Sequence, residues 1–182
     1  MIKVSQRNIG RSEPSALPIS SDQFERLIHE HSPALYRVAF RMLGDRHLAE
    51  DVLQEAFRSV WTGRAKLDPE RSERAWLASI LRRRIIDRWR KKSDVKSVGD
   101  SEMLDRASFD VDPFGDELSS EMQAALERLP TELKETLLLV VVGELTHREA
   151  AETLGVPIGT VLSRVNRARG RLREYLSARQ PK

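Results

Sequence analysis

The stretch "LTHREAAETLGVPIGTVLSRVNRARGRLREYL" (residues 145–176) carries the clearest structural signal in the sequence. Thr146 and Glu149 form a T-x-x-E capping box, which is typical of a helix start, and Gly155 is a typical helix end. After a short turn through Pro157, apolar residues recur with a helical period, which predicts a second helix. A helix, a short glycine-containing turn and a helix form a helix-turn-helix, and we expect that motif here.

The second of these helices has two unlike faces. At 100° per residue, an apolar stripe forms along one side from Val161, Val165, Ala168 and Leu172. The residues that point away from it are Ser163, Asn166, Arg167 and Gly170, flanked by Thr160, Arg164 and Arg171. Hydrogen-bonding groups near the N-terminal end can meet base edges in the major groove, while guanidinium groups further along can neutralise phosphates. The pattern favours duplex DNA as the partner, with a solvated arginine face as the alternative.

Helical periodicity recurs along most of the chain, and strand signals are almost absent. We therefore expect an all-α fold. Ser32 and Pro33 are typical of a helix start, and Gly44 is a plausible end of that helix.

A further helix is predicted over residues 48–61, with a broad apolar face. Its opposite face is mainly acidic and carries Asp51, Gln54 and Glu55. For an isolated helix, simple solvation is the more ordinary explanation of such a face.

The helix predicted over residues 72–92 carries a denser cationic cluster. Asp87 is the only acidic residue within this cluster. The basic residues of the cluster are Arg82, Arg83, Arg84, Arg88, Arg90, Lys91 and Lys92. Trp76 lies on the same side as Arg83, and an aromatic ring beside guanidinium groups suits unstacked single-stranded bases as well as duplex phosphate. Core packing explains Trp76 equally well, and it is the better explanation of Trp89.

Residues 93–117 differ abruptly in charge from both flanks. The segment is rich in acidic residues, and its only basic residues are Lys96 and Arg106. Self-repulsion and low hydrophobicity keep such a segment extended, so its roughly 25 residues can reach on the order of 80 Å. We therefore predict a flexible acidic linker, across which the two helical blocks can act far apart.

Two small helical domains are expected on either side of this linker, over residues 21–92 and 118–178. In the second domain, a helix ended by Pro130 is followed by one that Thr131 can cap and that stops at Gly143. The helix-turn-helix completes this domain.

The composition argues against several other classes of protein. The chain of 182 residues has no cysteine, and its four histidines show no metal-binding pairing, so we expect neither a metal nor a cofactor. The sequence has no phosphate-cradling glycine loop and no nucleophile motif, which argues against an enzyme. Residues 1–20 lack the apolar stretch of a signal peptide and are expected to be a disordered tail. No apolar run is long enough to cross a membrane, which predicts a cytoplasmic protein.

Three stretches are similar to a known family. "ALYRVAFRMLGDRHLAEDVLQEAFRSVW" (residues 34–61) and "RAWLASILRRRIIDRWRKK" (residues 74–92) resemble region 2 of the bacterial extracytoplasmic-function (ECF, group 4) sigma factors of the sigma-70 family. "LERLPTELKETLLLVVVGELTHREAAETLGVPIGTVLSRVNRARGRLREYL" (residues 126–176) resembles their region 4. The resemblance implies a dissociable subunit that does no chemistry but adds promoter recognition and strand opening to RNA polymerase core.

For region 2, the resemblance implies two sets of contacts. The acidic helix docks on the coiled coil of the polymerase β′ subunit through Asp51, Gln54 and Glu55. The following helix binds and helps to melt the −10 promoter element. Its candidate contacts are Trp76, Arg82, Arg83, Arg84, Arg88 and Arg90. The loop around residues 62–73 resembles the one that captures a flipped-out base.

Region 4 of the family reads the −35 element with the second helix of its helix-turn-helix, and its polymerase partner is the β flap. The matching residues are Thr160, Ser163, Arg164, Asn166, Arg167 and Arg169. Members of the family are typically held by anti-sigma factors that cover regions 2 and 4. We therefore expect an anti-sigma partner, which can hold the protein at the membrane.

Two positions depart from the family pattern. The common "ARN" reads Leu-Arg-Arg at residues 81–83, so Arg83 replaces a base-reading amide with a cation. The common "GTVKSR" reads "GTVLSR", so Leu162 removes a usual phosphate-binding lysine. The −10 preference therefore does not carry over, and −35 affinity is expected to depend more on the arginines of that helix.

Two other functions fit parts of the sequence. A sigma-like decoy would sequester an anti-sigma factor without binding DNA, but it would tolerate loss of the two arginine clusters that this chain keeps. An ordinary helix-turn-helix repressor or activator would use only the C-terminal block. Promoter-specific initiation by core polymerase discriminates all three.

Overall fold

The computed structural model describes residues 19–62, 72–96 and 120–178, and within them every regular element is an α-helix. In chain order the helices are α1 (Ser21–Leu43), α2 (Arg46–Trp61), α3 (Glu73–Lys96), α4 (Ser120–Glu127), α5 (Thr131–Val141), α6 (His147–Leu154) and α7 (Ile158–Ser177). The expected all-α fold is confirmed. Most of the predicted tail, of the predicted linker and of the loop expected to capture a flipped-out base lies outside the described residues.

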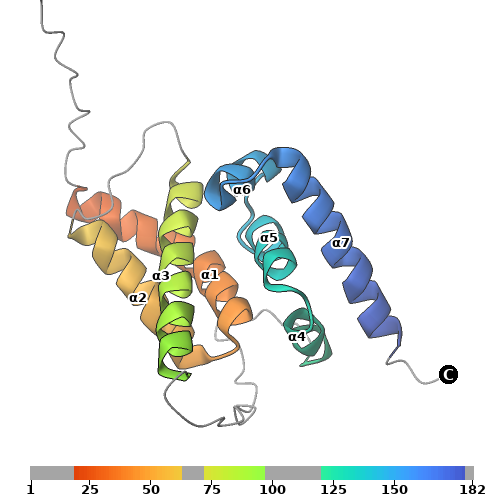
Figure 1. Cartoon of the computed structure of the whole chain (residues 1–182). Helices are drawn as coiled ribbons and strands as arrows, with labels where there is room; N and C mark the ends of the chain where they lie inside the picture. Colours follow the sequence, from red (N-terminus) through yellow and green to blue (C-terminus); the bar gives the residue numbers. More distant parts are fainter. Residues whose placement is uncertain (1–18, 63–71, 97–119, 179–182) are drawn as a thin grey trace, which may run out of the picture.

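Helices α1, α2 and α3 pack against one another as a three-helix unit (Figure 1). Gly44 ends α1 in the left-handed conformation at φ 69°, and its N–H donates to the Phe40 carbonyl oxygen at 2.8 Å. Asp45 caps α2 by accepting from the Leu48 backbone N–H at 2.9 Å. Because one residue closes α1 and the next opens α2, the chain reverses tightly and α2 packs on α1.

The prediction that the first helix starts at Ser32 and Pro33 is wrong, because α1 begins at Ser21 and contains the proline. The Ser32 hydroxyl donates to the carbonyl oxygen of Ile28, one turn earlier, at 2.6 Å. Proline inside a helix costs about 3 kcal/mol. The turns before and after it both bury apolar side chains in the core, and this packing outweighs the local stop signal.

Helices α4 to α7 form a second unit, in which α7 packs on the other three. The predicted capping box is confirmed. The Thr146 side chain accepts from the Glu149 N–H at 3.2 Å, and the Glu149 carboxylate accepts from the Thr146 N–H at 2.8 Å. Gly155 closes α6 at φ 68°, in the left-handed region that favours glycine. The predicted helix-turn-helix is therefore present as α6 and α7.

Thr131 does not cap α5, contrary to the prediction. It is the first residue of the helix, Pro130 holds the N-cap position, and no side-chain hydrogen bond caps the helix. Pro130 has extended backbone geometry, with ψ 139°. It is therefore the last residue before the helix, and it takes the cap position that the sequence assigned to Thr131.

The two units lie against each other, with α3 on α6 and α1 on α5 (Figure 1). Their buried apolar side chains belong to one cluster, which extends from Leu27 in α1 to Leu172 in α7. Helix α3 also continues to Lys96, past the domain end expected at residue 92. The sequence predicted two blocks able to act far apart, whereas in this structure they are in contact.

Candidate nucleic-acid interface

The apolar stripe predicted for α7 is confirmed, since Val161, Val165, Ala168 and Leu172 are all buried. The opposite side carries the predicted reading residues. Ser163, Asn166, Arg167 and Arg169 are exposed, while Thr160 and Arg164 are half-buried. The guanidinium of Arg164 reaches back to α5, where its Nη2 lies 3.5 Å from Oε2 of Glu132.

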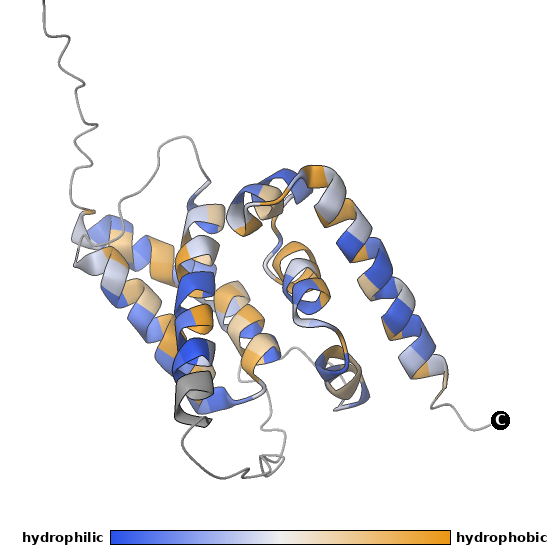
Figure 2. Cartoon of the chain, viewed as in Figure 1, coloured by the Kyte–Doolittle hydropathy of each residue, from blue (hydrophilic) through white to orange (hydrophobic). Residues whose placement is uncertain are grey.

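The exposed side of α7 is strongly cationic. The helix contains five arginines and one acidic residue, Glu174 near its C-terminal end. Figure 2 shows hydrophilic positions recurring along α7 between hydrophobic ones. This surface can meet polyanionic phosphate along its length and base edges near its start.

Helix α3 holds its predicted arginines in different ways. Arg83 and Arg90 are exposed. Arg84 Nη2 donates to the Ser59 hydroxyl of α2 at 2.5 Å, and Arg88 Nη2 donates to Asp51 Oδ2 of α2 at 2.7 Å. Two of these cations are therefore free to meet a ligand directly, while two first have to leave protein partners.

Trp76 is a core residue in this structure, with 4% of its surface exposed. The sequence left a base-stacking position and core packing open for it, and the structure places it in the core. Trp89 is partly buried and packs against the core, as expected.

The acidic side of α2 faces the cationic side of α3. Asp51 and Gln54 are exposed, and Glu55 is half-buried in an open cleft that Arg84 and Arg88 also line. The sequence assigned the acids and the arginines to different partners, and it did not predict that the two sets are adjacent. The sequence did offer a signal for this adjacency, because consecutive helices carry opposite charges, acids on α2 and arginines on α3.

Within the residues that the structure describes, no group of three or more His, Asp or Glu side chains is placed to hold a metal ion. Among those same residues, no helix is long and apolar enough to cross a membrane.

Comparison with known proteins identifies the family. Residues 27–95 match Sigma-70 region 2, and residues 119–172 match Sigma-70, region 4. The chain is 30% identical over 167 residues to the ECF RNA polymerase sigma factor SigW of Bacillus subtilis, which covers 85% of this chain and 89% of SigW. The chain belongs to the ECF sigma factors.

Two further similarities support this placement. This sigma factor is 33% identical over 160 residues to the ECF sigma factor SigE of Mycolicibacterium smegmatis, covering 85% of this chain and 62% of the length of SigE. Its fold matches the sigma factor RpoE of Bartonella quintana, solved in complex with the anti-sigma factor NepR. That match has a TM-score of 0.68 and 26% identity, and it covers 87% of this chain and 99% of RpoE.

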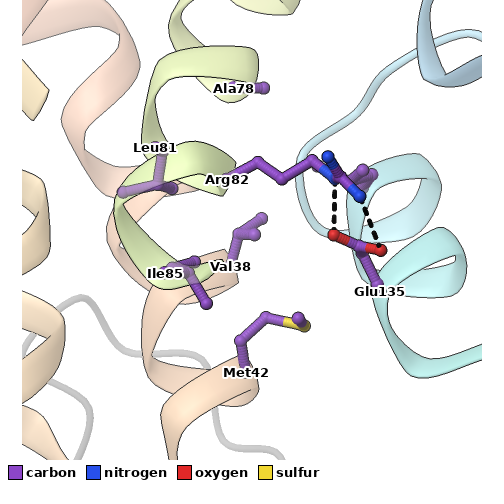
Figure 3. Close-up of a pocket in the computed structure, with 8 residues that line it drawn as sticks. Val38, Met42, Ala78, Leu81, Arg82, Ile85 and Glu135 are labelled. Carbon is purple, nitrogen blue, oxygen red and sulfur yellow. Dashed lines mark hydrogen bonds and ion pairs between the residues drawn. The ribbon is translucent and has the colours of Figure 1, made fainter. Parts of the chain in front are cut away.

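In this sigma factor, region 2 and region 4 are joined by an ion pair (Figure 3). Arg82 of α3 donates from Nε to Oε1 of Glu135 at 2.6 Å and from Nη2 to Oε2 at 3.5 Å. Glu135, on α5, is buried. The pair lies beside apolar residues of both regions, which are Val38, Met42, Ala78, Leu81, Ile85 and Leu139. Water screens the attraction between these two charges less than it screens a fully exposed pair.

Other polar contacts cross the same boundary. Arg74 of α3 lies 2.8 Å from the Glu144 carboxylate. Lys134 Nζ donates to the carbonyl oxygen of Met42 at 3.1 Å. Burial lowers the pKa of Lys134 below its usual value, and the negative charge of Glu127 partly opposes that shift.

The helix-turn-helix itself is tied to region 2. The Ser72 hydroxyl donates to the carboxylate of Glu149, the residue that also closes the capping box of α6. Burial raises the pKa of Glu149, but the hydrogen bonds from Ser72 and Thr146 and the charge of Arg74 outweigh it, so the pKa lies below its usual value.

These contacts between the regions were missed by sequence reasoning, which treated the regions separately. The available signal was the pair Lys134 and Glu135 within the largely apolar stretch "LKETLLLVV" of α5. Charged residues beside a buried face need partners, and here region 2 supplies them.

Proposed function

We propose that this ECF sigma factor binds the core of RNA polymerase and directs it to promoters, with region 2 on the −10 element and region 4 on the −35 element, and that it helps to separate the strands. The observation that carries this proposal is the face of α7. Exposed amide, hydroxyl and guanidinium groups lie opposite a buried apolar stripe, on the second helix of a capped helix-turn-helix. Such a helix suits the major groove.

For the −35 element, we assign base edges to Ser163 and Asn166, and phosphates to Arg167 and Arg169. Phosphate contacts position the helix and base contacts specify the sequence. Thr160 lies in the first turn, where the positive end of the helix dipole favours phosphate. Arg164 adds a further cation once it turns from Glu132 towards the DNA.

For the −10 element, Arg83 and Arg90 are the first contacts, because both are exposed in the free chain. Arg82, Arg84 and Arg88 join them by exchanging a protein partner for a phosphate. A contact from Trp76 requires its core packing to open. With a cation at Arg83 in place of the family's amide, the family's −10 preference is not carried over to this chain.

Polymerase docking is assigned to Asp51, Gln54 and Glu55 on α2, with the β′ coiled coil as the receptor. Region 4 is assigned to the β flap. The exposed Asp51 and Gln54 support the first assignment, since a docking surface has to be accessible. The adjoining arginines suit promoter strands that pass close to this docking surface.

Control by an anti-sigma factor is also part of the proposal. The related RpoE was solved in complex with the anti-sigma factor NepR, and the similarity to this chain spans both regions. We place the protein in the cytoplasm, held there or at the membrane by such a partner, and we assign it no catalytic activity of its own.

A decoy that only sequesters an anti-sigma factor is the main alternative. The exposed Arg83, Arg90 and Arg167 favour the promoter-directing function, because a decoy has no use for cationic groups aimed at DNA. A repressor that uses only its helix-turn-helix is disfavoured by the match of residues 27–95 to region 2.

Assembly with core polymerase tests the proposal. The full chain is mixed with bacterial core enzyme and sheared genomic DNA, and the transcription start sites are mapped. We expect co-elution with core and start sites that share a motif in two parts, absent with core alone. Co-elution without any specific start site would favour the decoy, and the absence of co-elution would contradict the docking assignment.

A further inference from the structure

Helix α7 exposes two large apolar side chains in its first two turns. Among the described residues, four large hydrophobic side chains are exposed, and two of them are Ile158, at 50%, and Leu162, at 43%. They are four positions apart and so lie on the same side of the helix. A single exposed apolar residue is ordinary. What sets this pair apart is its place on the helix that presents the reading residues.

Leu162 lies within the set of groups that we assign to base edges. Ser163 follows it directly, and Asn166 lies one turn further along the same side. Both are exposed, as Leu162 is. The reading face is therefore not uniformly polar, and an apolar strip adjoins its amide group.

The chemistry of the major groove offers one partner for such a strip. Leu162 has no charge for a phosphate and no donor or acceptor for a polar base edge. The C5 methyl group of thymine is the apolar group that base pairs present in the major groove. The amide of Asn166 can make a bidentate contact with adenine N6 and N7.

The spacing of the two residues agrees with neighbouring base pairs. Four residues of α-helix rise about 6 Å. Successive bases on one strand are about 3.4 Å apart along the duplex axis. Leu162 and Asn166 therefore reach positions within about two base steps of each other.

The charge of α7 favours DNA over other occupants of this surface. Five arginines and a single glutamate make the helix complementary to phosphate. The same charge repels a second copy of the helix.

We infer that Leu162, supported by Ile158, is a specificity-determining residue that reads a thymine methyl group in the −35 element, beside an adenine held by Asn166. The inference rests on the proposed function of region 4. At this position, the family's usual lysine makes a phosphate contact that carries no sequence information, whereas Leu162 makes an apolar contact with a specific base.

The test removes the methyl group from the DNA alone. The full chain, assembled with core polymerase, selects its −35 element from a duplex library with randomised positions. Each thymine of the selected element is then replaced in turn by deoxyuridine, which lacks only the methyl group. We expect about a fourfold loss of affinity at one position, the factor for burying one methyl-sized group, and less than twofold at the others.

Substitution of Leu162 identifies the protein side of the contact. In Leu162→Ala, thymine and deoxyuridine at that position should bind equally well, so the two changes should be non-additive. Leu162→Lys should also lose the preference and steepen the salt dependence by about one phosphate. Val141→Ala is the matched control, because Val141 is also an exposed apolar residue but lies on α5, and it should keep the full preference.

Several results would overturn the inference. One is the absence of a deoxyuridine penalty at every position, and another is an unchanged penalty in Leu162→Ala. A third is an effect of Leu162→Ala confined to self-association or to anti-sigma binding, which would make the strip a protein contact. Selection of no element at all would overturn the proposed function as well. A selected element without a thymine penalty would overturn only the role of Leu162.

Discussion

Arg82 of region 2 and Glu135 of region 4 are joined by a hydrogen bond of 2.6 Å between Nε and Oε1. In the proposed −10 contact, a promoter phosphate competes with the Glu135 carboxylate for this guanidinium. Glu135 engages Nε and Nη2 of Arg82, so a −10 phosphate that takes these same donors displaces Glu135 and removes this link between α3 and α5.

Glu135→Gln should therefore favour DNA binding by region 2. The amide keeps the shape of the side chain but loses the charge, so Arg82 leaves it more easily. We expect the free chain to bind a labelled single-stranded −10 oligonucleotide about fivefold more tightly, which corresponds to about 1 kcal/mol, the net contribution of a typical hydrogen bond. Fluorescence anisotropy measures this. Glu152→Gln removes an acid that pairs within α6 and should change nothing. Equal or weaker binding by Glu135→Gln would contradict the competition.

Arg167→Ala should weaken −35 binding in a salt-dependent way. Arg167 is exposed on α7 and is assigned to a phosphate. Its loss should lower the slope of log K against log salt by about 0.9. Titrations of a −35 duplex at several salt concentrations measure the slope. Arg148→Ala removes an exposed arginine of α6, and it should leave the slope unchanged. Unchanged binding in Arg167→Ala would rule out the assigned groove contact.

Charge reversal on α2 should prevent assembly with core polymerase. Asp51→Lys with Glu55→Lys replaces two assigned docking acids, and we expect at least a tenfold loss of core affinity, because lysines cannot make the contacts proposed for the carboxylates. The exposed ion pair between Asp51 and Arg88 contributes little to stability. The second lysine lies beside Arg84 and Arg88, so circular dichroism checks that the double variant keeps the fold. Glu25→Lys, an exposed acid on α1, is the control. Retained holoenzyme assembly by the double variant would refute the docking site.

Thr146→Ala should destabilise the chain by about 1 kcal/mol, because it removes the hydroxyl that caps α6. Thr131→Ala should cost less than about 0.5 kcal/mol, because Thr131 starts α5 without capping it. Urea unfolding of both variants measures the difference. Equal losses would show that capping does not distinguish the two threonines.

The carboxyl group of Glu73 should make stability depend on pH. Its hydrogen bonds from Arg26, at 2.9 and 2.7 Å, lower its pKa below the usual 4.5. A carboxyl with a lowered folded pKa stabilises the fold above its unfolded pKa, and that contribution is lost as the pH falls through the folded pKa. The stability difference between wild type and Glu73→Gln should therefore be largest above pH 4.5 and shrink below it. Thermal unfolding across that range measures it, and a constant difference would contradict the prediction.

Signals that act within a few residues predicted the helix-turn-helix well. Thr146, Glu149 and Gly155 satisfy neighbouring backbone groups, so their effect is readable from local spacing. The same reasoning failed at Ser32 and Pro33, where packing of the whole of α1 against the core outweighs a local start signal. The burial of Trp76 also depends on the packing of the core, which helical periodicity alone left undecided.

Contacts between the regions could not be predicted, because their partners are far apart in the sequence. Arg82 and Glu135 are separated by 53 positions, and each reads locally as a charge on an amphipathic helix. Periodicity says which face of a helix is apolar, but not which other helix will cover it. Candidate DNA-binding residues could therefore be named from the sequence. The protein groups that these residues contact could be identified only from the structure.

Run-off transcription tests the central claim most directly. Purified core polymerase is given a template carrying a promoter mapped with this sigma factor, with and without the full chain. The account predicts a transcript of one defined length that appears only when the chain is present and is lost when the −35 element is scrambled. A chain that fails to associate with core, or that associates and yields no specific transcript from any template, would contradict it.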